Sequence, residues 1–250
     1  MSPDRARDGS PASDALGAGH GAGPDPTGPT LSSEALRRLY AHRFDRRDRS
    51  WKVTLWQVLW EELVGRWVPP DACLLDLGAG GCELINAATA RRRIAVDLGD
   101  DTPLHAAPGV EVHQGSCDRL DFLAAGEVDV VFSSNFLEHL PDKDAVLRVL
   151  AEAHRVLRPG GRIVLIGPNI RFLADRYWDY FDHHVPLSDR SLAEALEVAG
   201  FEVEQVVPRL LPYTIKSRLP RATWLVRAYL RLGRVTGPLL GKQFLLVARR

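Results

Sequence analysis

A strand, a glycine-rich turn and the start of a helix follow one another at residues 74–84, and this segment constrains the fold more than any other. An apolar run that contains Asp76 leads into Gly78 and Gly80, and helix-forming residues follow. Glycine adopts backbone angles closed to other residues and presents no side chain to a ligand. Nineteen residues after Gly78, a second apolar run closes at Asp97, whose carboxylate suits the two hydroxyls of a ribose. These elements predict a site for a nucleoside cofactor; the alternative is a strand–turn–helix without a ligand.

The spacing of the glycines discriminates between cofactors. A dinucleotide fingerprint, Gly-x-Gly-x-x-Gly, would place its third glycine at position 83, which is Glu83. That carboxylate would repel a pyrophosphate but not a positively charged ligand. S-adenosylmethionine carries a sulfonium and an ammonium group and no phosphate, so the turn favours it over NAD.

Around this turn the chain resembles the class I S-adenosylmethionine-dependent methyltransferases, whose first motif is usually Asp-x-Gly-x-Gly-x-Gly. Cys82 stands where the family has its last glycine. Three later segments look like further landmarks of the family and follow in its order, at residues 110–118, 128–140 and 157–162. The resemblance covers about residues 72–250 and implies S-adenosyl-L-methionine as the cofactor.

The resemblance places the turn of Gly78 and Gly80 beneath the methionine part of the cofactor, and Asp97 at its ribose. After the third strand the family usually has an aspartate directly after a glycine, where this chain has Ser116. Asp118 lies two residues further on and is the stronger acceptor for the adenine amine. In such a sheet, ligands lie beyond the carboxyl ends of the strands. The expected cofactor-binding residues are Asp76, Gly78, Gly80, Asp97, Ser116, Asp118 and Asn135.

Short apolar runs alternate with helical patterns from residue 72 onward. Such runs are typical of a parallel sheet covered on both faces. We predict an α/β fold with a doubly wound, mostly parallel seven-stranded sheet. The predicted strands are 72–77, 93–97, 110–114, 128–133, 162–167, 201–207 and 243–248. The predicted helices of this domain are 83–91, 142–157 and 188–199, preceded by a helix at about 51–66.

Three parts are predicted along the chain. Residues 1–30 are rich in Gly, Pro, Ala, Asp and Ser, which predicts a disordered tail. Residues 31–70 are predicted to form a helical cap. Its tryptophans and leucines recur at helical spacing, and this apolar face is expected to pack in the core or over the cofactor. Residues 71–250 form the methyltransferase-like domain, with a basic helical insertion at about 214–238.

The composition is that of a soluble globular protein, with 45% hydrophobic and 26% charged residues. No stretch approaches the ~20 apolar residues of a membrane span, and the first residues lack the apolar core of a secretory signal. Cys73, Cys82 and Cys117 are too few and too widely spaced for a disulfide framework or a metal knuckle. We therefore expect a cytoplasmic protein, and no metal site is evident.

Two histidines are candidates for the base that a hydroxyl acceptor would require. His139 follows Glu138 in the turn after the fourth strand; the alternative is a structural role, paired with Glu138 or a backbone carbonyl. His183 lies in an aromatic-rich segment, residues 176–186, after the fifth strand, where the family often places acceptor-binding residues. In this hypothesis Asp182 orients His183. The alternative is a loop ordered by its own aromatic side chains.

The charge is strongly asymmetric along the chain. Residues 205–250 hold ten Arg or Lys and no Asp or Glu, which leaves 22 basic and 32 acidic residues in 1–204. Basic residues alternate with aromatic and aliphatic ones at 216–234, a pattern typical of helices on anionic membranes. This segment predicts peripheral contact with the inner face of the membrane. The alternatives are a helix packed with solvated arginines, or contact with nucleic acid or phosphate-bearing substrates.

The expected activity is methyl transfer from S-adenosylmethionine to a hydroxyl of a small molecule, a saccharide or a lipid-linked precursor. Nucleic acid is disfavoured because the turn at 134–137 contains no proline, whereas amino-directed nucleic-acid methyltransferases have Asn-Pro-Pro-aromatic there; Asn169 follows the wrong strand. Two other functions stay open. One is an NAD-dependent oxidoreductase, and the other is a non-catalytic cofactor-binding scaffold at a membrane surface.

Overall fold

The computed structural model describes residues 46–213 and 221–250. Its centre is a seven-stranded sheet in the order β3-β2-β1-β4-β5-β7-β6, in which β1 to β5 run parallel and β7 runs antiparallel between β5 and β6. The strands are β1 (Cys73–Leu77), β2 (Arg92–Asp97), β3 (Val110–Gln114), β4 (Val128–Ser134), β5 (Leu157–Pro168), β6 (Glu202–Val207) and β7 (Gln243–Arg249). The predicted α/β fold with a mostly parallel seven-stranded sheet is confirmed.

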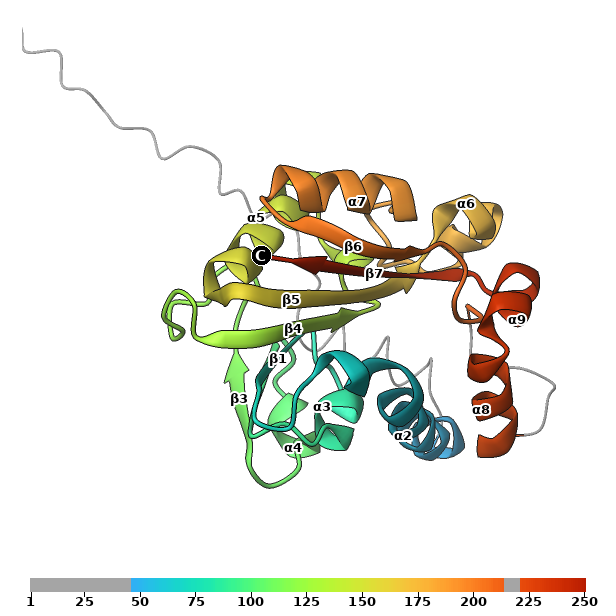
Figure 1. Ribbon diagram of the computed structural model, residues 1–250, viewed down its shortest axis with the longest axis horizontal. Helices are drawn as coiled ribbons and strands as arrows, with labels where there is room; N and C mark the ends of the chain where they lie inside the picture. The colour runs from blue at the N-terminus through green and yellow to red at the C-terminus, as the bar shows by residue number, and fades with distance from the viewer. Residues whose placement is uncertain (1–45, 214–220) are drawn as a thin grey trace, which may run out of the picture.

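Helices cover both faces of the sheet, α5 and α7 on one face and α2 and α3 on the other (Figure 1). The helices are α2 (Arg46–Leu59), α3 (Glu83–Ala87), α4 (Thr102–His105), α5 (Lys143–Val156), α6 (Ile170–Leu173), α7 (Asp189–Val198), α8 (Thr223–Arg231) and α9 (Gly233–Leu240). The short helical turns are η1 (Trp60–Val64), η2 (Gly65–Trp67), η3 (Leu137–His139) and η4 (Ala174–Asp179).

The central strands are largely apolar because both of their faces are buried. In β1, Leu75 and Leu77 belong to the core under α5 and α7, whereas Leu74 belongs to the core under η1 and α3. Asp76 is the polar residue of this strand, and it is only 4% exposed. A buried carboxylate in a strand that is otherwise apolar indicates a function at the carboxyl end of β1.

Two helices differ from the sequence prediction. The helix expected at 51–66 begins in α2 and continues through a wider and then a tighter turn, η1 and η2; a side chain at Gly65 would lie 2.8 Å from the carbonyl oxygen of Trp60. The helix expected at 83–91 ends at Ala87. There the amide of Asn86 donates to the carbonyl of His105 and accepts from Ala107 N.

The fifth strand is longer than the run at 162–167 predicted. Leu157 already pairs with Val128, and the register shifts before Val130 pairs with Arg162. Gly160 takes a φ of +77° in this irregular part of β5. The proline and glycines of residues 159–161 therefore end α5 without ending the sheet.

Between β6 and β7 lie α8 and α9, and α8 packs beside α2 and η1 (Figure 1). Residues 1–45 and 214–220, which include the predicted tail and much of the predicted cap, lie outside the described part of the chain. Within the described residues, no helix has both the length and the apolar character needed to cross a membrane.

Candidate active site

Gly78 and Gly80 form the turn between β1 and α3, and both have left-handed backbone angles, with φ of +70° and +49°. The amides of Gly78 and Ala79 donate to the carbonyl of Val96 on β2, which ties the turn to the neighbouring strand. A side chain at Gly78 would meet the ring of Phe136 at 2.5 Å, whereas one at Gly80 would meet nothing within 4 Å. Gly80 therefore lines the space open to a ligand, and Gly78 makes room for Phe136.

The carboxylate of Asp97 lies between this turn and the loop after β2. One of its oxygens accepts a hydrogen bond from Gly80 N and the other from Gly99 N, each at 2.7 Å. A carboxylate oxygen has two lone pairs, so each can accept a further hydrogen bond. Asp97 is half-buried and remains able to receive the two hydroxyls of a ribose.

Negative charge surrounds the turn. Burial raises the pKa of Asp76 well above its usual value, and the neighbouring charges of Asp97 and Glu83 raise it further. Lys52 on α2 opposes this shift; its ammonium pairs with Glu83 at 3.0 Å. A cationic ligand would stabilise the three carboxylates, whereas a pyrophosphate would meet them as like charges.

Cys82 shows why this position suits glycine: its φ is +59°, in the left-handed region. The side chain is fully buried, and its Sγ lies 3.7 Å from the carbonyl oxygen of Thr102. Burial raises the pKa of the thiol to about 12, so the group is not a nucleophile at neutral pH. The cysteine thus packs beneath the turn and leaves the side of Gly80 open.

Ser116 and Asp118 are in contact, with 2.6 Å between the hydroxyl and Oδ1. The hydrogen bond from Ser116 lowers the pKa of Asp118, and Arg148 on α5 lowers it further from 3.3 Å. The amide of Gly115 donates to the carbonyl of Asp97, which places this turn next to the predicted ribose site. The two candidates for the adenine amine therefore form one ionised acceptor group.

Asn135 occupies the turn after β4, with a φ of +50°. Its backbone N–H donates to the carbonyl of Ile166 on β5, and its side-chain Nδ2 donates to the hydroxyl of Ser134 at 2.8 Å. This left-handed residue directs the chain from β4 into Phe136, whose ring covers Gly78. The β4 turn and the glycine turn are thereby packed together.

His139, His183 and Glu138 converge at the carboxyl end of β4, with one polar atom of each within 4.8 Å of the others. Nδ1 of His139 lies 2.9 Å from the carbonyl oxygen of Asp182 and 3.3 Å from its carboxylate. The structure thus pairs Asp182 with His139, whereas sequence adjacency favoured His183. The rings of the two histidines are 4.9 Å apart.

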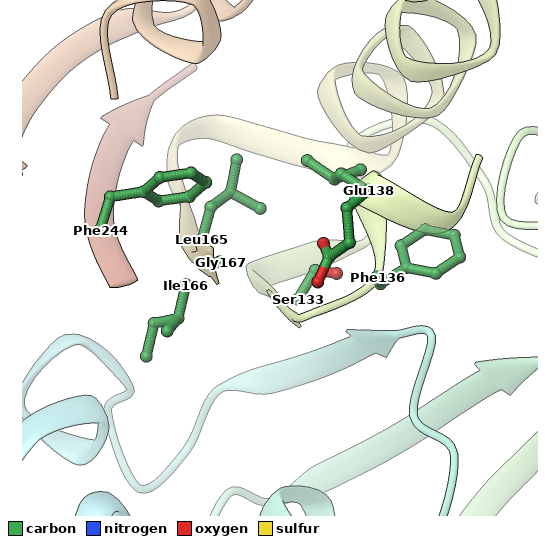
Figure 2. A pocket seen from close by; sticks show the side chains of 8 residues that line it. Ser133, Phe136, Glu138, Leu165, Ile166, Gly167 and Phe244 are labelled. Atoms are coloured by element: carbon green, nitrogen blue, oxygen red, sulfur yellow. The ribbon is translucent and has the colours of Figure 1, made fainter. Parts of the chain in front are cut away.

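Glu138 is buried, and burial raises the pKa of its carboxyl. Figure 2 shows this carboxylate beside Ser133 and Phe136, at a cavity of about 10 Å³ between the ends of β4 and β5. Such a volume accommodates about one water molecule. The sequence drew attention to Glu138 only as a partner for His139; its burial depends on Leu165 and Phe244, which line the same cavity.

The loop after β5 places aromatic side chains around His183. Tyr177 is fully buried and donates to the carbonyl of Val185, and the ring of Tyr180 stacks on His183 at 5.1 Å. Trp178 and Phe181 are 55% and 77% exposed. The buried aromatics fix the loop, and the exposed ones provide an apolar surface beside it. By contrast, Asn169 is structural: it is buried and donates to Asp189 and Pro208.

Three arginines of the basic segment, Arg221, Arg227 and Arg231, form ion pairs across the molecule. Arg227 contacts Glu61 and Glu62, and Arg231 lies 2.8 Å from Glu62. Arg221 contacts Asp48 on α2. The sequence analysis predicted that these guanidinium groups contact an anionic membrane, but here they pair with carboxylates of the same chain. Residues 216 and 218 lie outside the described part of the chain.

Part of the chain is similar to known methyltransferases. Residues 75–165 match the family model described as a methyltransferase domain. A relative from Mycolicibacterium smegmatis, described as a probable S-adenosylmethionine-dependent methyltransferase, is 35% identical over 157 residues, 60% of this chain and 59% of that protein. A ubiquinone biosynthesis O-methyltransferase from Xanthomonas axonopodis is 29% identical over 188 residues, 65% of this chain and 77% of that one. The chain spans about three fifths of the first relative's length.

Solved structures show the same fold at low sequence identity. An S-adenosylmethionine-dependent methyltransferase from Archaeoglobus fulgidus has a TM-score of 0.59 at 18% identity, covering 79% of this chain and 94% of that one. Another, from Mesorhizobium loti, has a TM-score of 0.53 at 20% identity, covering 77% and 98%.

Proposed function

We propose that this chain, which belongs to the class I S-adenosylmethionine-dependent methyltransferases, transfers a methyl group from S-adenosyl-L-methionine to a hydroxyl of a small-molecule, saccharide or lipid-linked acceptor. The observation that carries the proposal is the acid-lined glycine turn. Asp76, Glu83 and Asp97 are close enough to one another to raise the pKa of Asp76, and Asp97 accepts a hydrogen bond from Gly80, whose side-chain direction is open. A ligand at this turn would be stabilised by positive charge. The same carboxylates, with Glu83 in place of a third glycine, argue against NAD.

The residues present fit S-adenosylmethionine. Asp97 would hold the ribose hydroxyls, the Ser116–Asp118 pair the adenine amine, and Asp76 and Gly80 the charged methionine part; Asn135 shapes the adjoining turn. When bound, this cofactor supplies a methyl group already activated on a sulfonium. The main task of the protein is then to align the acceptor oxygen and to exclude water.

A hydroxyl acceptor is favoured by the histidine cluster at the end of β4. A hydroxyl is protonated at neutral pH, so its proton has to leave during transfer. His139 and His183 lie together next to the turn that packs on Gly78, and they would handle this proton as bases or as ligands of a cation. The relatives named as ubiquinone biosynthesis O-methyltransferases support transfer to oxygen. The exposed rings of Trp178 and Phe181 suit an acceptor with an apolar or sugar face.

The test is incubation of the purified chain with methyl-labelled S-adenosylmethionine and a cell extract, with Asp97→Ala as the matched control. We expect label in a small-molecule, saccharide or lipid fraction, and much less with the variant. Cofactor binding without label in any fraction would favour a non-catalytic scaffold.

A thermal-shift comparison of S-adenosylhomocysteine with NAD separates the methyltransferase from an oxidoreductase, because we expect only S-adenosylhomocysteine to stabilise the protein.

Peripheral membrane contact through residues 216–234 stays a separate prediction. The ion pairs of Arg221, Arg227 and Arg231 with α2 and η1 favour a packed helix, whereas Trp224 and Leu232 are 68% and 59% exposed. Flotation with anionic vesicles tests the contact. Co-flotation lost in Trp224→Ser supports it, and protein that stays in the soluble fraction rejects it.

A further inference from the structure

Glu138, His139 and His183 offer metal-binding atoms from two separate segments, the turn η3 after β4 and the loop after η4. These atoms lie within 4.8 Å of one another. Three ligands that are each about 2.1 Å from one zinc ion lie at most about 3.6 Å from one another. Rotations of the side chains that move these atoms by about 1 Å would therefore bring the three donors onto one ion.

The surroundings of His139 are those of a metal ligand. Metal-binding histidines nearly always donate their second ring N–H to a carbonyl or a carboxylate, which fixes the tautomer and the orientation of the ring. Nδ1 of His139 makes both contacts with Asp182, to its carbonyl at 2.9 Å and its carboxylate at 3.3 Å. Nε2 is then the nitrogen left for an ion, and it faces Glu138 Oε1 at 3.9 Å.

The charge of Glu138 supplies a second, independent reason for a cation. Its side chain is 3% exposed, and among the described residues its ion pairs are limited to His139. A buried carboxylate has to be paired, protonated or bound to a metal. A divalent ion bound between Glu138 and the two histidines would neutralise this buried charge.

We propose that Glu138, His139 and His183 bind one divalent transition-metal ion, such as Zn²⁺ or Mn²⁺, which holds the acceptor hydroxyl. Two nitrogens and one carboxylate suit these ions better than Mg²⁺ or Ca²⁺, which prefer oxygen ligands. The remaining coordination positions would take water or the acceptor. The role of the ion rests on the proposed methyl transfer, but the metal site does not.

The ion would act as a Lewis acid on the acceptor. A hydroxyl bound to a divalent ion has a lowered pKa and releases its proton to solvent water at neutral pH. The resulting oxygen then forms a bond to the methyl carbon while the carbon–sulfur bond breaks and its electron pair returns to sulfur, giving a neutral thioether. Phe136, which packs on Gly78 and lies beside Glu138 (Figure 2), places this centre next to the cofactor turn.

The test uses the untagged full-length chain, dialysed against Zn²⁺ or Mn²⁺ and then against metal-free buffer. We expect one ion per chain by elemental analysis, and at least a tenfold weaker affinity in calorimetry for His183→Ala and for His139→Gln. His184→Ala is the matched control, because His184 is the exposed neighbour outside the cluster and should bind like the wild type. Circular dichroism confirms that each variant is folded.

Two results would overturn the proposal: no bound ion in the wild type, or equal binding by the wild type and both folded cluster variants. Chelation then tests the role of the ion, and unchanged methyl transfer by the metal-free protein would reject it. Calorimetry with S-adenosylmethionine is independent of these outcomes. If the wild type does not bind S-adenosylmethionine, the proposed methyl transfer is refuted, but the proposed metal site is not affected.

Discussion

Gly78 and Gly80 share a left-handed backbone but lack a side chain for different reasons. At Gly78 the ring of Phe136 occupies the position that a side chain would take, whereas at Gly80 that position is open to a ligand. Cys82 takes the same backbone region with a side chain, which it buries against Thr102. At the residue scale, therefore, one glycine serves packing and the other serves binding.

We predict that Gly78→Ala destabilises the protein by about 2–5 kcal/mol, because the methyl group would overlap the ring of Phe136 and the backbone disfavours a side chain. Gly80→Ala should cost about 1–2 kcal/mol in stability but should weaken cofactor binding, since its methyl group enters the crevice. Urea unfolding and calorimetry measure the two effects. Equal losses of stability in the two variants would contradict the assignment.

The buried carboxylate of Asp76 should lower the free energy of unfolding of the cofactor-free protein, while it strengthens the binding of a cationic ligand. Its pKa is higher in the folded chain than the unfolded value of 3.8, so the folded chain binds more protons. The free energy of unfolding then falls as the pH rises from about 3.8 to the folded pKa, and the loss is complete above it. Asp76→Asn should raise the melting temperature of the cofactor-free protein at neutral pH and weaken S-adenosylmethionine binding. The gain in stability should vanish at acidic pH; a variant less stable at pH 7 would refute this.

Asp97→Ala is predicted to weaken cofactor binding by about 2–4 kcal/mol, through loss of charge-assisted hydrogen bonds to the ribose. Asp97→Asn is the control, because it can still accept from Gly80 N and so preserves part of the turn. Calorimetry should rank the affinities wild type, Asn variant, Ala variant. An unchanged dissociation constant in the Ala variant would remove Asp97 from the site.

At the scale of elements, α8 is attached to η1 by ion pairs between residues more than 160 positions apart. Glu62 joins two arginines, Arg227 and Arg231, whereas Glu61 contacts only Arg227 among the described residues. The helix that the sequence analysis assigned to a membrane surface therefore lies against Glu61 and Glu62 of η1. This arrangement follows from charges that attract across the fold, not from a local motif.

Glu62→Gln should loosen α8, because it removes the charge shared by two arginines while keeping the size of the side chain. Limited trypsin digestion should then cut faster at Arg227 and Arg231 than in the wild type. Glu61→Gln, which loses a single contact, should have a smaller effect. Identical digestion of both variants would show that apolar packing, not charge, holds the helix.

The strands were predictable because buried strands are largely apolar runs, and six of them both begin and end within two residues of the expected bounds. The fifth, β5, begins before its glycines because Leu157 finds a partner in Val128. Short elements such as α4 and α6 were not foreseen, since four residues carry too little periodicity. Likewise, the contact between Asp182 and His139, which lie 43 positions apart, was not predicted from the sequence, because only the fold brings these two segments together.

For the whole molecule, the net charge of zero conceals a functional separation of charge. The basic C-terminal residues are partly neutralised by acids of α2 and η1. At the glycine turn, Asp76, Glu83 and Asp97 lie near one another, and Lys52 pairs with Glu83. This excess of carboxylates favours a cationic cofactor.

Calorimetric titration of the wild-type chain with S-adenosylmethionine, with NAD as the parallel ligand, tests this central claim most directly. We predict saturable binding of one S-adenosylmethionine per chain and no measurable binding of NAD. Absence of S-adenosylmethionine binding, or tighter binding of NAD, would contradict the account.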